Sequence, residues 1–353
     1  CVSKCAYCDF YSAPAGHTML DRYTDVLCRH ISEAAKKLNK KADTLYFGGG
    51  TPSLLGGKRL SELISAAKSA FLTDDAEITI EANPAEHLYD DLLMLRAAGA
   101  DRLSLGVQSG VESELGAISR RHTVSDAERT IKDAKAAGFR NISVDLMLGL
   151  PYQTMRSLEK SIEFALSLDV QHISCYILKL EPGTPLYKLQ KSSPASLSLP
   201  DEDTVADMYL YMSEVLRQNG FLHYEISNFA KAGYSSRHNL KYWNDREYLG
   251  LGPAAHSYLD GKRFYFERDT EKYLSSPTPV SDGSGGDPAE AIMLRLRLSC
   301  GIDLPELRRL LGSVDTAKFL AKAERFSDAG LAVLDSAHFA LTEKGFLVSN
   351  AVI

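Results

Sequence analysis

Three cysteines at the start of the chain have a spacing that suits a metal–sulfur site. Cys1, Cys5 and Cys8 form a C-x3-C-x2-C pattern in the run CVSKCAYCDF. Three thiolates on one short loop can hold three irons of a [4Fe-4S] cluster and leave the fourth iron without a protein ligand. A metal with a vacant position can bind a second molecule, as catalytic zinc sites do. The loop therefore predicts a metal centre that is open to chemistry.

Two other uses of these cysteines are compatible with the sequence. The loop could bind zinc if Asp9, His17 or His30 supplied a fourth ligand, although zinc sites more often show paired C-x2-C units or a C-x2-C with distant histidines. Disulfide pairing is disfavoured, because six cysteines in 353 residues are too sparse to staple a small secreted fold. The other cysteines lie in apolar surroundings and are expected to be buried small hydrophobes: Cys28, Cys175 and Cys300.

The elements that must position this loop follow an alternating order. Helical periodicity covers 18–39, 58–71, 87–98, 124–137 and 154–168, and strand patterns cover 44–52, 77–84, 102–109, 141–151 and 172–178. Strands separated by helices predict parallel pairing, hence a closed or partial α/β barrel or an open doubly wound sheet. Glu81, Gln108 and Asp145 each lie at or near the C-terminal end of a different strand. Barrel enzymes place their ligands at those ends, so these residues favour the barrel.

The chain changes character after Pro182, and we expect three segments: a barrel core at 1–182, a linker and site-covering region at 183–278, and a C-terminal domain at 279–353. The run at 181–200 is rich in Pro and Ser and is typical of a linker, 221–258 suits an irregular region, and 279–288 suits a flexible boundary. Helical stretches at 288–299, 303–311 and 315–329 precede a β-hairpin pattern. That order predicts a helical, winged-helix-like domain.

Composition limits the classes of partner. A hydrophobic content of 44% is ordinary for a globular protein, and no apolar run is long enough for a transmembrane segment. The absence of a signal-peptide pattern favours a cytoplasmic protein, with at most peripheral membrane association. A net charge of −6 and the lack of a basic face argue against nucleic acid as a partner. The first residue is not Met, so we expect a longer natural chain with a strand upstream of Cys1.

The run GGGTP at 48–52 directly follows a predicted strand. Consecutive glycines let backbone amides and carbonyls approach a charged amino-acid end or a phosphate, and they equally suit a tight turn. It is not a P-loop, because no Lys-Ser or Lys-Thr pair follows at the required spacing.

CVSKCAYCDF and GGGTP, with the downstream runs GVQS, ISRRHT and VDLMLGLP, together resemble the radical S-adenosylmethionine superfamily. Within it, the chain resembles the branch that contains oxygen-independent coproporphyrinogen dehydrogenase and the haem chaperone. The resemblance covers nearly the whole chain. It implies a partial (β/α)6 barrel of the TIM type with a smaller C-terminal helical domain.

The resemblance also implies roles for the candidate residues. The open iron of the cluster would be chelated by S-adenosylmethionine, which an electron from the cluster would cleave to a 5'-deoxyadenosyl radical. The ammonium of that cofactor would meet Glu81 and the backbone at Gly49, Gly50 and Thr51, and its carboxylate would suit Arg120. Gln108 and Asp145 would hold the ribose, and Tyr7 would lie against the adenine. Lys179 and His256 match cofactor-lining positions through the resemblance only.

Each of these side chains also has an ordinary structural use. Glu81 and Asp145 could be strand-end capping groups, Gln108 a satisfied polar residue, and Arg120 a surface residue beside Arg121.

The run HNLKYW at 238–243 resembles the H-N-x-x-Y-W motif of the haem-chaperone branch. His238 can ligate haem iron, Asn239 completes the motif, and Tyr242 and Trp243 offer flat faces to a porphyrin. Histidine is otherwise usually a hydrogen-bonded structural residue.

Two functions share this barrel. One is a haem chaperone, a possible homodimer that delivers haem to apo-proteins of respiration, and the other is a coproporphyrinogen III dehydrogenase that decarboxylates two propionate chains. The dehydrogenase pattern carries a further cysteine two positions after the third ligand, where this chain has Asp9-Phe10 directly after Cys8. That difference and HNLKYW favour the chaperone. A zinc-binding barrel without radical chemistry is the third possibility.

Overall fold

The computed structural model describes residues 1, 3–85, 87–194 and 197–352, and it groups them into two compact units. The first contains Cys1–Met208, Leu251–Ala255 and Phe266–Val280. The second contains Tyr209–Gly250, His256–Tyr265 and the chain from Ser281 onward. The three-segment division with bounds at 182 and 278 stays a prediction.

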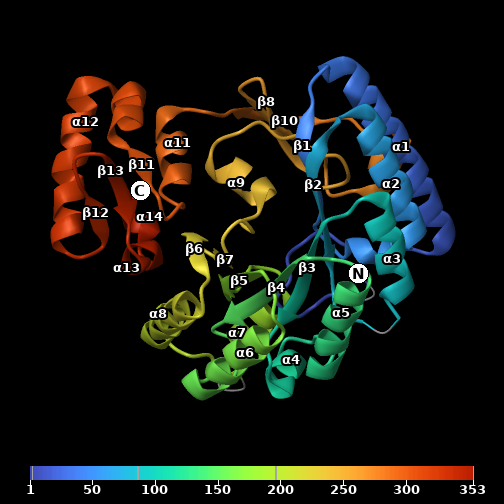
Figure 1. Cartoon of the computed structure of the whole chain (residues 1–353), viewed down its shortest axis with the longest axis horizontal. Coiled ribbons are helices and arrows are strands. Elements are labelled where there is room, and N and C mark those ends of the chain that lie inside the picture. Colours follow the sequence, from blue (N-terminus) through green and yellow to red (C-terminus); the bar gives the residue numbers. More distant parts are fainter. Residues whose placement is uncertain (2, 86, 195–196, 353) are drawn as a thin grey trace. The chain divides into compact units, whose positions relative to one another are not determined.

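A curled parallel sheet forms the centre of the first unit, in which five strands lie in sequence order (Figure 1). They are β1 (Ala42–Phe47), β2 (Leu72–Ala82), β3 (Arg102–Gln108), β4 (Asn141–Leu148) and β5 (His172–Ile177). Their connections contain the helices α2 (Gly56–Ala70), α3 (Tyr89–Ala98), α4 (Glu112–Ala117), α5 (Val124–Ala136) and α6 (Met155–Ser167), and α1 (His17–Leu38) precedes β1. This open half-barrel confirms the predicted α/β class.

The strands read as apolar runs because helices cover the outer face of the sheet and side chains fill the inner one. Every residue of β3 is buried, including Leu103 and Leu105. The helices are amphipathic, and α5 turns Ala127, Ile131 and Ala134 into the core. Parallel strands that are buried in this way bring their C-terminal ends to one edge of the sheet, where the candidate residues lie.

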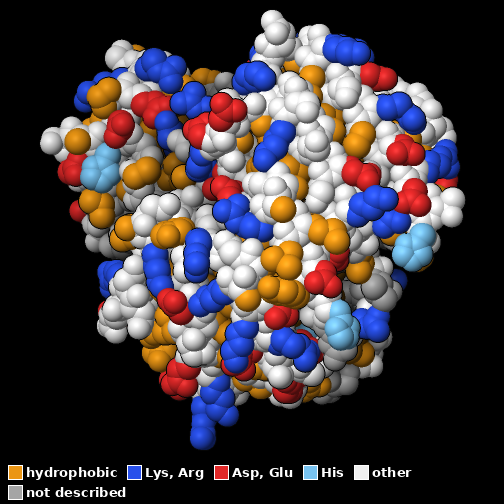
Figure 2. Space-filling model, turned by 45° about the vertical axis from the view of Figure 1, so that its right-hand side comes forward, with side chains coloured by type: hydrophobic (Ala, Val, Ile, Leu, Met, Phe, Trp, Pro, Cys, Tyr) orange, Lys and Arg blue, Asp and Glu red, His pale blue; other side chains and the backbone are white. Residues whose placement is uncertain are grey.

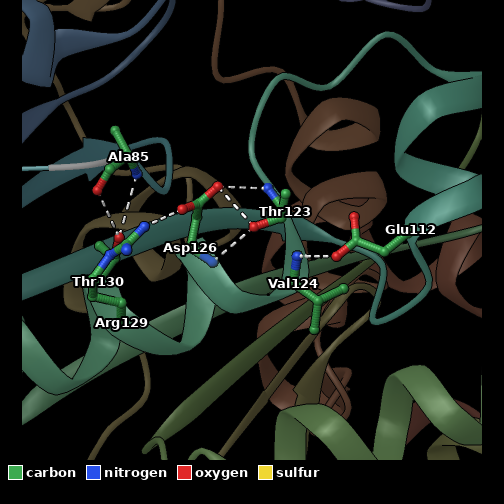
Figure 3. Close-up of polar contacts among 7 residues, drawn as sticks. All are labelled: Ala85, Glu112, Thr123, Val124, Asp126, Arg129 and Thr130. Atoms are coloured by element: carbon green, nitrogen blue, oxygen red, sulfur yellow. Dashed lines mark hydrogen bonds and ion pairs between the residues drawn. The ribbon is translucent and has the colours of Figure 1, made fainter.

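Hydrogen bonds at the start of α5 hold two of the connecting segments in place (Figure 3). Thr123 and Asp126 form a capping box, in which the Thr123 hydroxyl accepts from the Asp126 backbone N–H at 3.1 Å and the Asp126 carboxylate accepts from the Thr123 backbone N–H at 2.8 Å. The Val124 N–H donates to Glu112 at 2.8 Å. The Thr130 hydroxyl contacts both backbone groups of Ala85, at 3.2 and 3.3 Å. Helix α5 therefore anchors the segment after α4 and the segment after β2.

The run predicted to be a linker contains a helix, which corrects that expectation. Helix α7 (Pro185–Ser192) begins after Thr184, whose hydroxyl accepts from the Tyr187 N–H, and Pro185 occupies the first helical turn. The Leu186 N–H donates to the carbonyl of Ala6 at 2.9 Å. Helix α7 thus supports the cysteine loop. Residues 195 and 196 of the same run lie outside the described residues.

Two further helices lie between β5 and the C-terminal region. Helix α8 (Glu202–Gln218) follows α7 along the chain, and α10 (Thr270–Ser275) belongs to the first unit. Helix α10 begins at Asp269, whose carboxylate accepts from the Lys272 N–H at 3.0 Å.

The second unit has short strands and helices where the sequence suggested irregular chain. Strands β6 (Leu222–Glu225) and β7 (Asn228–Ala230) form an antiparallel hairpin, and α9 (Arg237–Trp243) follows. Strands β8 (His256–Leu259) and β9 (Lys262–Tyr265) pair with each other, and β10 (Val280–Ser284) joins them in a three-stranded sheet. The expectation of an irregular region at 221–258 is therefore corrected. The expected boundary at 279–288 contains β10, and the two units divide within it, between Val280 and Ser281.

The C-terminal region contains the predicted helices followed by a hairpin. Helices α11 (Pro288–Arg295) and α12 (Leu304–Asp328) precede β12 (Ala332–Leu334) and β13 (His338–Leu341), and β11 (Ile302–Asp303) pairs with β13. The chain ends in α13 (Glu343–Leu347) and α14 (Ser349–Val352). Two helical patterns merge into α12 across Gly312, which has a φ of 70° and divides them as the sequence suggested.

Among the helices described, none is both long and apolar enough to span a membrane. Lys and Arg side chains are interspersed with Asp and Glu over the face in view in Figure 2. Cys175 is buried as predicted, whereas Cys28 is half-buried and Cys300 is exposed, which corrects the expectation that all three are core residues.

Candidate functional site

The cysteine loop is held by backbone hydrogen bonds and carries three free thiols. The Cys8 N–H donates to the Cys5 carbonyl at 3.2 Å, and the Ala6 N–H donates to the Ile118 carbonyl at 3.1 Å. Cys1, Cys5 and Cys8 are half-buried and unpaired by disulfides. Burial raises the pKa of the Cys5 thiol, and the positive charge of Arg120 opposes that rise. A nearby guanidinium therefore favours the thiolate that a metal needs.

The donor set fits an iron–sulfur cluster better than zinc. Within the residues described, no group of three or more His, Cys, Asp or Glu side chains is already gathered around a metal position. Two of the candidate fourth ligands for zinc have other partners: Asp9 accepts from Arg268 at 3.4 Å, and His30 contacts the Tyr273 hydroxyl at 2.6 Å. What remains on the loop is three soft thiols, the set that iron–sulfur clusters use.

The glycine run lies against the cysteine loop. A Cβ at Gly50 would lie 3.8 Å from the Cys1 sulfur, and the Thr51 hydroxyl lies 3.1 Å from the same sulfur. Gly49 has a φ of 107°, which disfavours any other residue. A Cβ at Gly48 would lie 2.6 Å from the Tyr46 ring, so a side chain does not fit there. The structure therefore brings GGGTP and the first cysteine together.

Glu81 lies at the end of β2 and faces the same glycine run. Its carboxylate accepts from the Tyr46 hydroxyl at 2.6 Å and from the Gly49 N–H at 3.1 Å. Burial raises the pKa of Glu81 to about 6, although the Tyr46 and Gly49 hydrogen bonds oppose the rise, while the nearby Asp145 adds to it. The carboxylate is therefore ionised above about pH 6 and suited to receive a cation.

A chain of polar contacts links Cys1 to Arg120 through a residue that the sequence analysis missed. The Thr51 hydroxyl accepts from the Asn83 side-chain amide at 2.9 Å, and the Asn83 carbonyl oxygen accepts from Arg120 at 2.6 Å. Asn83 comes two residues after Glu81, so the alternation of a strand places both side chains on the same side. That spacing is the signal that could have found it.

Arg120 and Gln108 share a space that only a glycine leaves open. A Cβ at Gly106 would lie 2.8 Å from Arg120 Nη2, 2.9 Å from Gln108 Nε2 and 3.1 Å from Asn83 Oδ1. Gln108 has a φ of 70° at the point where the β3–β4 register shifts. The regular strand conformation is therefore interrupted at this residue. Arg120 Nε is buried and has no hydrogen-bond partner among the described residues. This donor cradle is suited to an anion, and the alternative of a surface arginine is wrong.

Asp145 and a buried arginine complete the polar interior of the sheet. Burial raises the pKa of Asp145, opposed by a hydrogen bond from Ser174 and by the charges of Arg102 and Arg120. The Ser104 hydroxyl also donates to Asp145, at 3.4 Å. Arg102 is only 1% exposed, and it lowers the pKa of Glu81 as well. The sequence analysis missed Arg102, although a charged residue that opens an otherwise apolar strand was a visible signal.

Tyr7 packs against a small apolar cluster formed by Ile118, Met147 and Leu150. Burial raises the pKa of its hydroxyl to about 12, and the charge of Arg120 opposes the rise. The ring is therefore neutral and fixed beside the thiol loop. Lys179 is paired with Glu181 at 2.7 Å and is 82% exposed, and His256 belongs to the second unit, where it stacks on Tyr265. The cofactor-lining roles of Lys179 and His256 therefore stay predictions from the resemblance.

The HNLKYW run forms helix α9, which begins at Ser236. The Ser236 hydroxyl accepts from the Asn239 N–H at 3.2 Å. His238 and Tyr242, four residues apart, lie on one face, with 3.0 Å between His238 Nε2 and the Tyr242 hydroxyl. Trp243 is five residues after His238, so its side chain leaves the helix about 140° away. The structure brings His238 and Tyr242 together and gives Trp243 a separate environment.

Comparison with known families places two models on the chain. The model of the radical SAM superfamily matches residues 1–165, and the model of the HemN C-terminal domain matches residues 287–348. The first range contains the cysteine loop, the glycine run and Arg120. The second covers α11 to α13.

Known relatives match over most or all of this chain. The haem chaperone HemW of Bacillus subtilis is 34% identical over 100% of this chain and 95% of its own length. HemW of Escherichia coli is 37% identical over 84% of this chain and 80% of its own. The mouse mitochondrial radical S-adenosyl methionine domain-containing protein 1 is 38% identical over 72% of this chain and 58% of its own.

Among solved structures, the coproporphyrinogen III oxidase HemN of Escherichia coli matches with a TM-score of 0.84. The match covers 100% of this chain and 86% of that one, at 22% sequence identity. At that identity the likeness shows the fold, and the fold is that of a radical SAM enzyme.

Proposed function

Because the chain belongs to the radical S-adenosylmethionine superfamily and, within it, to the HemW family of haem chaperones, we propose that it binds haem and delivers it to apo-haem proteins of respiration. The observation that carries this proposal is the 34% identity to a HemW over the whole chain. The match includes both the cysteine loop and helix α9. Membership of the family supports haem binding. That the acceptors are respiratory proteins is our own proposal.

The cysteine loop would hold a [4Fe-4S] cluster through Cys1, Cys5 and Cys8. The open iron would bind S-adenosylmethionine, whose sulfonium the cluster can cleave reductively when that chemistry is used. The free thiols and the guanidinium beside Cys5 support this assignment.

The strand ends would hold S-adenosylmethionine by charge and shape. Glu81 and the backbone at Gly49, Gly50 and Thr51 would receive its ammonium, since Glu81 is ionised at neutral pH. Arg120 would bind its carboxylate with the buried N–H that lacks a partner among the described residues. The remaining contacts are Gln108 and Asp145 to the ribose and Tyr7 to the adenine. Asn83, bonded to Arg120, would keep the guanidinium in place.

Helix α9 would bind haem through His238, with Asn239, Tyr242 and Trp243 completing the motif. His238 is half-buried, and Tyr242 is 38% exposed, so the face they share is accessible. The Tyr242 hydroxyl holds His238 Nε2, which sets the ring orientation before iron arrives. Ligation through that nitrogen would displace the hydroxyl.

The alternative is an oxygen-independent coproporphyrinogen III dehydrogenase. The structural likeness to HemN shows a shared fold, and the HemW relatives are more similar in sequence, at 34% against 22% identity. Two positions after Cys8, where the dehydrogenase pattern has a further cysteine, this chain has Phe10. These observations favour the chaperone.

The test compares binding with catalysis in one preparation. Protein reconstituted anaerobically with iron and sulfide is mixed with haem, and the Soret band is followed for wild type and His238→Ala. We expect saturable haem binding that the variant weakens, and transfer of haem to an apo-cytochrome. Decarboxylation of coproporphyrinogen III without haem binding would contradict the proposal.

A further inference from the structure

Glu225, at the end of β6 in the second unit, is a fully buried acid outside the sites described so far. Its side chain is 0% exposed. The residue pairs by an antiparallel bridge with Leu298, and the neighbouring Ile226 N–H donates to the Arg297 carbonyl at 2.9 Å. A carboxylate buried in this way costs free energy unless polar groups compensate it. Its neighbours therefore show what the residue is for.

The neighbour that matters is Trp243, the last residue of the HNLKYW helix. The Trp243 side chain lies close enough to Glu225 to lower the pKa of the acid, as do the Asn228 amide and the Ser227 backbone N–H. Within the described residues, the buried Trp243 N–H has no acceptor in normal hydrogen-bond geometry, and neither Glu225 oxygen has a donor. A buried N–H and a buried carboxylate that lie close together are favourable partners, because an unsatisfied polar group in the interior costs free energy.

A charged group that influences this acid is Arg297. Its positive charge lowers the pKa of Glu225, while its own N–H groups donate to Ser349 at 3.0 Å and to Asn350 at 2.9 Å. Arg297 is thereby committed to the last helix. The groups that act on the carboxylate by hydrogen bonding are the Ser227 backbone N–H, the Asn228 side chain and the indole of Trp243.

Strand β6 also fixes the other end of α9. The Ser236 N–H, at the start of the helix, donates to the hydroxyl of Tyr224 at 3.2 Å. Tyr224 and Glu225 are adjacent, so two consecutive strand residues contact the first and last residues of one short helix. A helix of seven residues has little stability of its own and depends on such contacts.

We propose that Glu225 is a positioning residue for haem binding, which fixes helix α9 through the indole N–H of Trp243 so that His238 and Tyr242 present their shared face to haem. This role rests on the proposed haem-binding function of α9. It separates the two aromatic residues of the motif, with Tyr242 on the binding face and Trp243 as the anchor.

The position of the acid makes this contact sensitive to pH. Burial raises the pKa of Glu225 to about 7, and Ser227, Asn228, Trp243 and Arg297 oppose the rise without cancelling it. An ionised carboxylate accepts a stronger hydrogen bond than a protonated one. The anchor is therefore tight above about pH 7 and weaker below it.

Trp243 is the only tryptophan in the chain, so its fluorescence reports on the contact directly. In haem-free protein, the emission of wild type should titrate with a midpoint near pH 7, and that titration should vanish in Glu225→Gln. Glu343→Gln is the matched control, because Glu343 is an acid of the same unit that pairs with His223 and should leave the titration intact. A titration that survives Glu225→Gln overturns the contact.

Haem titrations test the positioning role. At pH 8, Glu225→Gln should weaken haem binding about tenfold, the range expected for one hydrogen bond to a charged group. At pH 6 the variant should match wild type, in which the acid is then protonated. Trp243→Phe should weaken binding at both pH values, and the double variant should be no weaker than Trp243→Phe alone.

The outcomes separate this role from the proposed function. If wild type shows the fluorescence titration and no Soret change, haem binding is wrong and the positioning role falls with it. If wild type binds haem and Glu225→Gln binds equally well at pH 8, only the positioning role is overturned. A folded-state check by circular dichroism accompanies each variant, and His238 is present in all of them, so its own titration cancels in the comparison.

Discussion

The corner at the strand ends of the first unit and the α9 segment of the second unit hold their functional groups in different ways. In the corner, Cys1, Thr51, Asn83 and Arg120 form one linked chain, and each comes from a loop that is tied to the sheet or to its helices. Helix α9 has seven residues and is held at its two ends. The first arrangement suits a resident cofactor, and the second suits a ligand that must be released.

The two regions also differ in how the charges of their buried acids are balanced. In the corner, acidic and arginine side chains lie close together. Burial raises the pKa of Glu81 and of Asp145, and the charge of Arg102 opposes both rises. Near α9, Glu225 has a raised pKa of about 7 with one arginine nearby, which is itself bonded to Ser349 and Asn350. The buried acids of the corner are therefore balanced by nearby arginine charges, whereas Glu225 beside α9 gains or loses its proton near neutral pH.

The largest expected effect is loss of the cluster. Replacing Cys1, Cys5 or Cys8 with Ser should abolish the iron and sulfide content of reconstituted protein, because three thiolates are needed to hold the cluster. Cys300→Ser is the matched control, since that thiol is exposed and outside the loop. A variant without Cys5 that still holds a full complement of iron and sulfide would break the assignment of the corner.

The next largest effect concerns the affinity for S-adenosylmethionine, which depends on Arg120 and on the Asn83 side chain bonded to it. Arg120→Ala should weaken binding of the cofactor by about a hundredfold, as loss of a charge-assisted pair to its carboxylate. Asn83→Ala should weaken it by about tenfold through a misplaced guanidinium. Equilibrium binding to protein with an intact cluster measures both. Arg121→Ala is the control, because Arg121 is exposed. Equal effects of Arg120→Ala and Arg121→Ala would remove Arg120 from the site.

The two regions should also be separable by mutation. His238→Ala should weaken haem binding by about tenfold or more through loss of an iron ligand. It should leave cluster content and S-adenosylmethionine affinity unchanged, since α9 contributes none of the corner residues. His338→Ala is the control for loss of an ordinary histidine, because His338 lies in the same unit and pairs with Asp335. Iron analysis and Soret titration on the same samples decide the matter, and a His238→Ala protein without a cluster would contradict the separation.

The smallest effect concerns stability. Because the folded-state pKa of Glu225 lies above that of a free glutamic acid, the folded state binds the proton more tightly. Its contribution to stability is therefore present below about pH 4.5 and is lost as the pH rises to about 7, by roughly 3 kcal/mol. Denaturant unfolding at pH 5 and pH 8 should show this loss in wild type and not in Glu225→Gln. An identical pH dependence in both proteins would mean that Glu225 is not the titrating group.

Much of the corner was predictable because its groups follow strands. The alternation of strands and helices predicted Glu81, Gln108 and Asp145 on neighbouring strands, and the cysteine spacing carried its own chemistry. In the structure Glu81 and Gln108 lie at strand ends and Asp145 lies inside β4. Asn83, Gly106 and Arg102 were not predicted. Their roles depend on what lies across the sheet: Gly106 matters because Arg120 and Gln108 fill the space above it, and no single-sequence pattern states that neighbour.

The second unit was harder to predict for a physical reason. Its strands have two to five residues, too few for a period to be seen, and α9 has seven. Glu225 looks like an ordinary polar residue after a Tyr, and only the structure shows that it is fully buried opposite Trp243. Helix α7 was missed because its Pro and Ser content resembles a linker, although Pro185 belongs to the first helical turn.

The most direct test of the account is an anaerobic titration of cluster-loaded wild type and His238→Ala with haem, read at the Soret band. The account predicts saturable binding of haem by wild type, binding about tenfold or more weaker in the variant, and the same iron and sulfide content in both. Haem binding of equal strength in the two proteins would contradict the assignment of the α9 face. Absence of any saturable binding by wild type would contradict the proposed function itself.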